Sequence, residues 1–422
     1  MAQITAVRTT KGNRSKPNHR ICLVVVLALS VLVVSWSQRN NLPSTEEDNI
    51  NHTPKIRAAT ATSNLVRTVN KPRKGNFIYK PHTDPKLEPT NCSNLLDKYR
   101  IGQISQTNQA SKSYPIDKSY VTRSNTQYAF QVSVHDEKVD GMRYAIFNSG
   151  DYYETVMSDV IADIFNKADA NTQQPVMLDV GANVGWFALL AASHGAEVFA
   201  FEPNVINIVR FCESQLLNGW SLAQNVEGNN RIHTYMAGVG NQHGQSLSMY
   251  KPDPNNPGSF TFNQELAKDH FAKRKAGGEL EQLDGGALPI VTLDALAKDQ
   301  GWLSDESSKV KIDLMKIDVE GMEHIALEGA KELLQSNIIE NILMEINADA
   351  SRSDLVAQVR TLFECGYRLY KIGGHLGPNK EFNLSIDDPE VVIDDIKNRD
   401  FGIAGSNANV WFKVKTKREA RK

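Results

Sequence analysis

Cysteine is scarce in this sequence, and neither sign of charge is in excess. Four cysteines in 422 residues are too few for a disulfide framework. Cys22 falls in an apolar N-terminal run, which leaves an odd number, and we expect Cys212 and Cys365 to be small buried side chains in helices. The formal net charge is −2, so the sequence lacks the basic balance that favours a nucleic-acid partner.

A long apolar run occurs near the N-terminus, from Ile21 to Trp36, and the 20 residues before it contain no acidic side chain. As a helix the run would span about 24 Å, somewhat less than a hydrocarbon core of ~30 Å. Basic residues precede the run and acidic residues follow it, which places the N-terminus in the cytoplasm.

This run is interpreted as a membrane anchor. We predict a cytoplasmic basic tail at 1–20, a transmembrane signal anchor at 21–37, and a single-pass type II protein whose remainder faces the Golgi or endoplasmic reticulum lumen. Cleavage of the run as a signal peptide, which would release a secreted protein, is the alternative.

Residues 38–120 have the composition of a flexible stem. Prolines recur among Asn, Thr, Ser and Lys, and no apolar periodicity is sustained. Such a composition buries too little apolar surface to offset the entropy of ordering. Two glycosylation sequons begin here, at Asn51 and Asn91, and a third begins at Asn383. A basic tail at 416–422 is expected to be a solvated end.

From residue 121 to 415 the pattern is that of an α/β domain. Two β-prone runs around a turn at Asp140-Gly141 predict a hairpin from 128–136 and 142–150. Apolar strands then alternate with helices, which predicts a mostly parallel sheet covered on both faces. The last two strands follow one another directly and suit an antiparallel edge. The predicted strands are 175–181, 196–203, 232–240, 313–321, 339–347, 368–374 and 407–415, and the helices are 154–168, 186–194, 205–218, 322–336 and 353–367.

Four of the predicted strands carry an acidic residue at or near their carboxyl end. In open parallel sheets, ligands bind beyond the carboxyl ends of the strands. One acidic residue in such a place is commonly a helix cap or turn former, whereas four together indicate a site. These residues are Asp179, Glu202, Asp318 and Glu345.

The loop DVGANVG at 179–185 combines a carboxylate with two glycines. Glycine permits a tight turn and lets a ligand approach bare backbone, and the next helix offers free N–H groups to a negative group. Glu202 follows Asp179 by 23 residues, where a carboxylate can accept hydrogen bonds from the hydroxyls of a ribose. The loop lacks G-x-G-x-x-G spacing and the chain has no G-x-x-x-x-G-K-[ST]. A nucleoside-containing cofactor is therefore favoured, and a nucleotide-dependent oxidoreductase is disfavoured.

Several motifs, in this order, resemble the FkbM-type S-adenosylmethionine-dependent methyltransferases. They are LDVGANVGWFALLAA, VFAFEPN, the helix-ending Asn218, VTLDAL and DLMKIDVEGMEHIALEGAKELL, and they extend from about Gly150 to Asn347. PNNPGSF at 254–260 is similar to a turn of the same family. The resemblance implies a Rossmann-like methyltransferase fold, with a mostly parallel seven-stranded sheet and an antiparallel edge. It also implies methyl transfer to an oxygen, often a hydroxyl of a sugar or polyketide.

The same resemblance assigns residues to the cofactor S-adenosylmethionine. It implies that the methionine part is surrounded by Asp179, Gly181, Asn183 and Gly185, that the ribose is held by Glu202, and that the adenine lies beside Pro203 and Asn204, with Ala237 and Gly238 at its edge. Two departures stand out. Asn347 occupies a position where family members often carry a histidine, and most of the polar segment 251–289 does not align.

Methyl transfer to a hydroxyl usually needs a base or a metal, because a hydroxyl is a weak nucleophile at neutral pH. Asp318 and Glu320 face the transfer end of the site by position, and Glu345 and His324 are further candidates. Glu320 has an alternative as a cap of the next helix. A divalent cation held by Asp318, Glu345 and Asn347 is the alternative to a base, but no ligand spacing supports it.

The sequence is therefore interpreted as a lumenal O-methyltransferase that acts on a hydroxyl of a glycan or glycoconjugate. The sugar follows from the expected location and the family tendency, since no sugar-binding motif is recognisable. Two alternatives stay open: a methyltransferase for a lipid or small secondary metabolite, and a non-enzymatic adaptor that retains the fold. The intact Asp179, Gly181, Gly185 and Glu202 make the adaptor less favoured.

Overall fold

The computed structural model describes part of the chain, and all statements below refer to that part. Among these residues no helix is both long and apolar enough to cross a membrane. The predicted anchor, the sequons at Asn51 and Asn383, residue Asn347 and the basic tail lie outside the described residues. Those described are 83–98, 120–135 (without 125 and 127), 153–168, 173–220, 232–251, 260–273, 280–282, 287–303, 310–346, 352–371, 385–386, 388–398 and 408–414.

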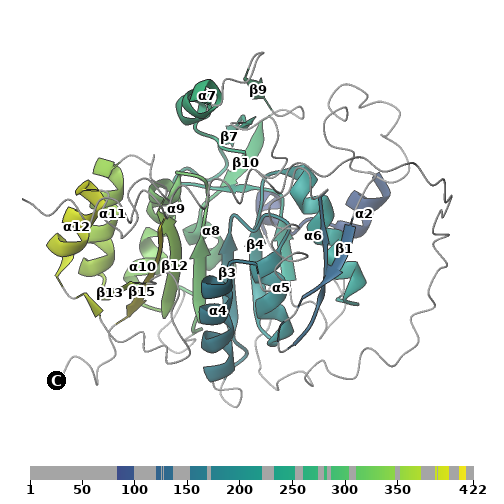
Figure 1. Ribbon diagram of the computed structural model, residues 1–422. Helices are drawn as coiled ribbons and strands as arrows, with labels where there is room; N and C mark the ends of the chain where they lie inside the picture. Colours follow the sequence, from purple (N-terminus) through teal and green to yellow (C-terminus); the bar gives the residue numbers. More distant parts are fainter. Residues whose placement is uncertain are drawn as a thin grey trace, which may run out of the picture. The chain divides into compact units, whose positions relative to one another are not determined.

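A mostly parallel sheet forms the centre of the domain (Figure 1). The parallel strands lie in the order β5-β4-β3-β11-β12, so the chain runs outward from β3 to one edge and then returns to the other side. This reversal beside β3 is where such sheets bind ligands. The strands are β3 (Val176–Val180), β4 (Glu197–Phe201), β5 (Ile232–Tyr235), β11 (Leu314–Ile317) and β12 (Asn341–Ile346).

The edge beyond β12 is antiparallel. Strand β15 (Ala408–Val414) inserts between β12 and β13 (Tyr367–Lys371) and is antiparallel to both. A two-residue strand, β14 (Ser385–Ile386), adds to β13. The predicted antiparallel edge is confirmed, and within the described ranges the sheet has eight strands instead of the predicted seven because of β14.

Helices cover both faces of the sheet, and the strands alternate between two cores. Val176, Leu178 and Val180 of β3 belong to one core, whereas Met177 faces the other. The second core is covered by α4 (Thr155–Lys167) and α5 (Trp186–Ser193). The first is covered by α8 (Leu293–Asp299), α9 (Glu323–Glu328), α10 (Lys331–Gln335), α11 (Arg352–Glu364) and α12 (Pro389–Asn398).

The single helix predicted at 322–336 is two short helices, α9 and α10. Gly329 lies so close to Gly240 that a Cβ atom would sit 1.9 Å from the Gly240 carbonyl oxygen. The Asp294 carboxylate then accepts the backbone N–H groups of Glu332 and Leu333 and starts the second helix. The prediction was wrong because these contacts come from segments remote in the sequence.

Part of the predicted stem packs on the domain. The 3₁₀ helix η2 (Pro85–Leu87) and helix α2 (Cys92–Asp97) bury Leu87 in the main core, and Cys92 forms a disulfide with Cys212 of α6 (Val205–Leu217). Residues 83–98 are called the strap below. The stem prediction is therefore wrong for the strap, and Cys212 is buried but bonded. A few apolar residues among many prolines and polar residues gave no periodic signal.

The strap lies along the edge strand β5. The Thr90 backbone N–H donates to the Thr234 carbonyl at 2.6 Å, and the Met236 N–H donates to Thr90 Oγ1 at 2.9 Å. Close by, β1 (Tyr120–Arg123) and β2 (Gln131–Val134) form an antiparallel pair. Strand β2 lies within the predicted hairpin strand 128–136, and it pairs with β1, a segment that the sequence did not indicate. The other predicted hairpin strand, 142–150, lies outside the described residues.

The chain between β5 and β11 forms an insertion above the sheet (Figure 1). Three short strands make a small mixed sheet, and α7 with a two-stranded ladder completes it. This insertion supplies one wall of the cavity described next. Its elements are β6 (Gly238–Val239), β7 (Ser246–Leu247), β8 (Tyr250–Lys251), α7 (Gln264–Lys273), β9 (Glu281–Gln282) and β10 (Leu288–Val291).

Candidate active site

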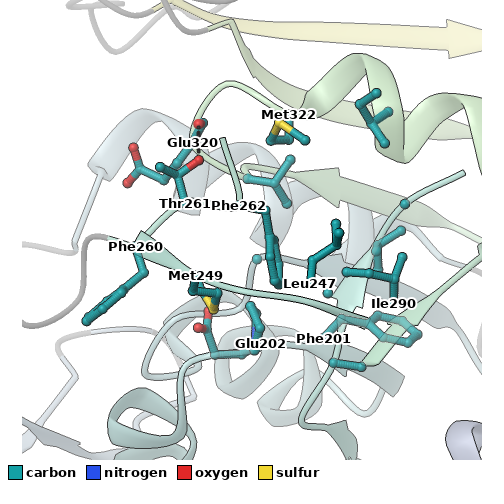
Figure 2. A pocket seen from close by; sticks show the side chains of 18 of the residues that line it. Phe201, Glu202, Leu247, Met249, Phe260, Thr261, Phe262, Ile290, Glu320 and Met322 are labelled. Carbon is teal, nitrogen blue, oxygen red and sulfur yellow. Dashed lines mark hydrogen bonds between the residues drawn. The ribbon is translucent and has the colours of Figure 1, made fainter. Parts of the chain in front are cut away.

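A cavity of about 350 Å³ opens at the carboxyl ends of β3, β4, β5 and β11, under the insertion (Figure 2). This is the size of a small-molecule site and the place expected in such a sheet. The carboxylates of its lining come from the strand ends, whereas the insertion supplies most of the apolar side chains and the polar Asn241, Gln242, Gln245 and Thr261. Predicted site residues that line it are Gly181, Asn183, Glu202, Pro203, Ala237, Gly238, Asp318 and Glu320.

The loop after β3 is shaped by contacts within the protein. Gly181 has φ +81°, and a Cβ atom there would lie 1.8 Å from the carbonyl oxygen of Asp318. Gly185 has φ +88°, and a Cβ atom would lie 2.1 Å from the Phe211 ring. Only Gly181 of the two borders the cavity. The glycines are thus needed for close packing against β11 and α6, and not solely for a ligand's approach.

Glu202 holds both neighbouring loops. Its Oε2 accepts the Asn183 backbone N–H and its Oε1 accepts the Asn204 N–H, each at 2.8 Å. Asn204 is buried and caps α6, because its side chain accepts the Ile206 N–H at 3.0 Å. Burial raises the pKa of Glu202 to about 7, although the two backbone hydrogen bonds act against the increase. A carboxylate fixed in this way can accept hydrogen bonds from a ligand's hydroxyl groups.

Lys316 is a functional residue that the sequence analysis missed. It is 3% exposed; its Nζ donates to the Gly181 carbonyl at 2.8 Å and lies 3.3 Å from Asp318 Oδ2 and 3.8 Å from Asp179 Oδ1. Burial would lower the pKa of Lys316, but the carboxylates of Asp318, Asp179 and Glu154 raise it above its ordinary value. A lysine inside the apolar strand LMKI is the signal that could have identified it.

Asp179 lies behind the cavity wall. It is 0% exposed and is absent from the lining. Burial raises its pKa to about 6, with Lys316 opposing and Asp318 adding to the increase. The side chain therefore supports the Gly181 loop through Lys316 and has no surface to offer a ligand.

Asp318 and Glu320 stand together at the end of β11. Asp318 is ion-paired with Lys316, and Glu320 has the left-handed φ of +54° that few non-glycine residues adopt. Glu323 supports this loop by accepting the backbone N–H groups of Gly321 at 3.0 Å and Val319 at 3.3 Å. Burial of the carboxyl group, with added repulsion from Asp318 and Glu323, raises the pKa of Glu320 to about 7, although the residue as a whole is exposed.

The opposite wall is apolar and comes from the insertion, with Phe260 and Phe262 in the segment 251–289 that did not align. Met249, Phe260 and Phe262 lie between Glu320 and Glu202 in Figure 2, with Leu247 and Ile290 farther along. The Phe262 ring packs over Gly238, where a Cβ atom would lie only 2.5 Å from it. The sequence of this wall shows no helical or strand periodicity, so the wall could not be predicted from the sequence.

Several predicted residues stay outside the lining. Glu345 pairs with Asn409 in the β12–β15 ladder and does not border the cavity. His324 is buried, with Nε2 3.9 Å from Asp354, and is likewise absent from the lining. Among the described residues, no group of three or more His, Cys, Asp and Glu side chains is placed to hold a metal ion.

Comparison with known proteins identifies the domain. Residues 179–369, just under half of the chain, match the methyltransferase FkbM domain. The chain is 28% identical over 203 residues to Methyltransferase sdnD of Sordaria araneosa, covering 46% of this chain and 73% of the relative. The resemblance inferred from the motifs is thus confirmed, and the segment 179–369 is an FkbM-type methyltransferase domain.

Solved structures are more distant. One is an S-adenosylmethionine-dependent methyltransferase of Agrobacterium tumefaciens, with 13% identity, coverage of 58% of this chain and 59% of that one, and a TM-score of 0.30. Another is Trm5b of Pyrococcus abyssi, with 14% identity, 71% and 56% coverage, and a TM-score of 0.30. The chain thus spans less than two thirds of each, and at these scores the likeness carries no argument.

The cofactor of this type of domain is S-adenosylmethionine, and the lining fits that molecule. Glu202 supplies a fixed carboxylate for ribose hydroxyls. Phe201, Ala237, Val239 and Ile290 offer apolar surface for a planar base. No lysine, arginine or histidine is found in the described lining, so the donor set suits a nucleoside without phosphate groups.

Proposed function

We propose that this chain, with its FkbM-type methyltransferase domain, transfers a methyl group from S-adenosylmethionine to a hydroxyl oxygen. The observation that carries this proposal is the position of Glu202 and Glu320 on one cavity at the carboxyl ends of β4 and β11. One carboxylate is fixed by two backbone amides, and the other stands in a loop of unusual backbone conformation. A strained residue at a cavity commonly belongs to the chemistry.

Cofactor binding is assigned to the two loops that Glu202 connects. When bound, S-adenosylmethionine supplies a methyl group made electrophilic by a positively charged sulfur. Glu202 accepts hydrogen bonds from the ribose hydroxyls. The base is bordered by Pro203 and the Ala237–Gly238 turn, and the remaining part of the cofactor is bordered by Gly181 and Asn183. Asp179 and Gly185 act indirectly, by fixing the loop that carries Gly181.

Glu320 is proposed as the base that takes the proton from the acceptor hydroxyl. A general base works best when its pKa is near the working pH, and burial raises the pKa of Glu320 to about 7. The Asp318 carboxylate is ion-paired with Lys316, so it is already engaged within the protein. We therefore assign two roles to Asp318. It holds the loop after β11 in place, and its negative charge favours the positively charged sulfur of the cofactor. Glu345 has no part in this proposal.

A glycan hydroxyl in the secretory pathway remains the proposed acceptor. The apolar run at 21–36 supports entry into that pathway. The Cys92–Cys212 disulfide supports it independently, because disulfides persist mainly in oxidising compartments. The Golgi or endoplasmic reticulum lumen, with the chain held as a type II membrane protein, is thus the proposed location.

One observation favours a second acceptor class. Met249, Phe260 and Phe262 give the cavity an apolar wall, which suits a lipid or a small secondary metabolite with a hydroxyl group. An adaptor that retains the fold without activity is less favoured, because the cavity and its carboxylates are formed.

The test is methyl transfer by the full-length chain with methyl-labelled S-adenosylmethionine. Separate acceptor pools of released glycans, total lipids and small metabolites are compared, and the labelled product is treated with base to distinguish esters from ethers. Base-stable label on glycans, lost in Glu320→Gln, supports the proposal. Label on lipids alone selects the second acceptor class, and label on none of the pools with cofactor bound contradicts methyl transfer to a hydroxyl.

A further inference from the structure

We infer that the acceptor part of the cavity admits hydroxyl compounds that carry no acidic group and excludes those with a carboxylate, sulfate or phosphate beside the hydroxyl. The inference rests on the proposed function and deepens it by naming the charge class of the acceptor. It follows from the distribution of charged and apolar side chains around the cavity.

Above pH 7, where Glu202 and Glu320 have lost their protons, negative charge dominates the described lining. Three carboxylate side chains, Glu202, Asp318 and Glu320, border the cavity, and the described lining contains no basic side chain. An anionic acceptor would therefore enter against like charges without a cation to pair with. Inside a partly desolvated cavity such repulsion is stronger than in water.

Lys316, which pairs with Asp318 of the lining, cannot serve an acceptor. Lys316 is 3% exposed and is absent from the lining. Its Nζ already donates to the Gly181 carbonyl and pairs with Asp318 and Asp179. To reach a ligand, Lys316 would have to break these contacts. The buried carboxylate of Asp179 would then lose its ion pair, which is energetically costly.

More carboxylates stand behind the wall. Glu154 is close enough to Asp318 and Lys316 to interact with both, and Glu323 holds the loop that carries Glu320. The positively charged sulfur of the methyl donor offsets part of this charge. The described carboxyl groups in and behind the cavity wall still outnumber Lys316 and this sulfur. Among the described residues, a positive potential for recognising an acidic sugar is therefore not available.

The apolar wall indicates what the acceptor offers instead. Met249 and Phe260 lie on one side of the cavity, near Glu202, and Met322 lies beside Glu320 (Figure 2). A compound with a hydroxyl group next to an apolar face can pack against this wall and place the hydroxyl at Glu320. Neutral pyranosides have such a face, as do neutral aromatic alcohols.

A direct test uses one matched pair of small probes on the full-length chain loaded with S-adenosylhomocysteine. Binding of 4-nitrophenyl β-glucoside and 4-nitrophenyl β-glucuronide, which differ only in the carboxylate, is measured by ligand-observed NMR titration. We expect the glucoside to bind at least tenfold more tightly. Equal or tighter binding of the glucuronide overturns the inference, and so does absence of binding by both. Because the measurement needs a bound cofactor product but no methyl transfer, failure of the charge discrimination is distinguishable from failure of the transfer reaction.

A pair of variants assigns the discrimination to the cavity. Glu320→Gln removes one lining charge, whereas Glu265→Gln removes a charge from α7, where the side chain is 83% exposed. We expect the affinity ratio of the two probes to fall several-fold in Glu320→Gln and to stay as in the wild type in Glu265→Gln. Equal ratios in all three proteins would contradict the inference. In the transfer assay, reduction of the carboxyl groups of acidic glycans to alcohols should restore their acceptance.

Discussion

Lys316 Nζ lies 3.3 Å from Asp318 Oδ2 while it donates a hydrogen bond to the carbonyl of Gly181, 2.8 Å away. One buried side chain thus joins the loop after β3 to the loop after β11. The first loop borders the proposed cofactor position and the second carries the proposed base. The relative position of cofactor and base therefore depends on Lys316.

Replacing Lys316 with methionine should destabilise the fold. Asp179 is 0% exposed and would lose the cation 3.8 Å away, and removing one partner of a buried pair costs about 3–5 kcal/mol. The loss, measured by urea unfolding, should be smaller at pH 5 than at pH 8, because Asp179 can then take a proton.

Lys298→Met is the matched control. Lys298 pairs with Glu332 on the surface, with both side chains more than half exposed, and such pairs contribute little to stability. If the two lysine variants lose the same stability, Lys316 does not hold a buried charge network.

The sequence predicted most of the fold because the motifs at the centre are local. DVGANVG, FEPN and IDVEG each combine a strand, a turn and the start of a helix, so that Asp179, Glu202 and Asp318 were all placed correctly at or near strand ends. Which of them borders the cavity was not predictable. That depends on side-chain direction, and Asp179 turns toward Lys316 instead of the cavity.

The parts that the sequence did not predict depend on contacts between distant segments. The strap is held by a disulfide between residues 120 positions apart and by pairing of Thr90 with Thr234. The apolar wall comes from short strands and loops of the insertion, which brings Met249, Phe260 and Phe262 together. Glu345 was assigned to the site because it lies near a strand end, but it does not border the cavity.

The stability of the domain should fall as the pH rises from about 4.5 to 7. Burial raises the pKa of Glu202 to about 7 in the folded state, above the value of about 4.3 for a free glutamate. The folded protein thus keeps a proton that the unfolded chain loses, and the unfolding free energy decreases over this interval and is flat above it. Glu202→Gln should remove on the order of 2–3 kcal/mol of this dependence. Urea unfolding at pH 5 and pH 8 measures it, and an unchanged slope in the variant would contradict the assignment.

Activity should rise with pH through about 7 if Glu320 is the base. The deprotonated form is the active one, so kcat on the acid side should increase tenfold per pH unit until Glu320 is ionised, at a pKa of about 7. Glu320→Gln should lower kcat by roughly 10²–10⁴ and abolish this acid limb. A variant that keeps the wild-type pH profile would assign the proton transfer to another group.

Loss of the Cys92–Cys212 disulfide should destabilise the strap and the adjoining edge of the sheet. A cross-link over 120 residues is expected to contribute about 2–5 kcal/mol. Cys92→Ser should therefore unfold at a lower temperature than the wild type, and a reductant should lower the wild type to the same value. Cys365→Ser removes a free thiol and serves as the control. Equal thermal stability of all three proteins would show that the strap needs no cross-link.

The central claim is that the loop after β3 and Glu202 form one S-adenosylmethionine site, and calorimetric titration of the full-length chain tests it most directly. We predict binding by the wild type, weakening of well over tenfold in Glu202→Ala, and wild-type affinity in Glu364→Ala, which alters an exposed glutamate of α11. Circular dichroism establishes that each variant is folded. A folded wild type that binds no cofactor at millimolar concentration, or a Glu202→Ala variant that binds as tightly as the wild type, would contradict the account.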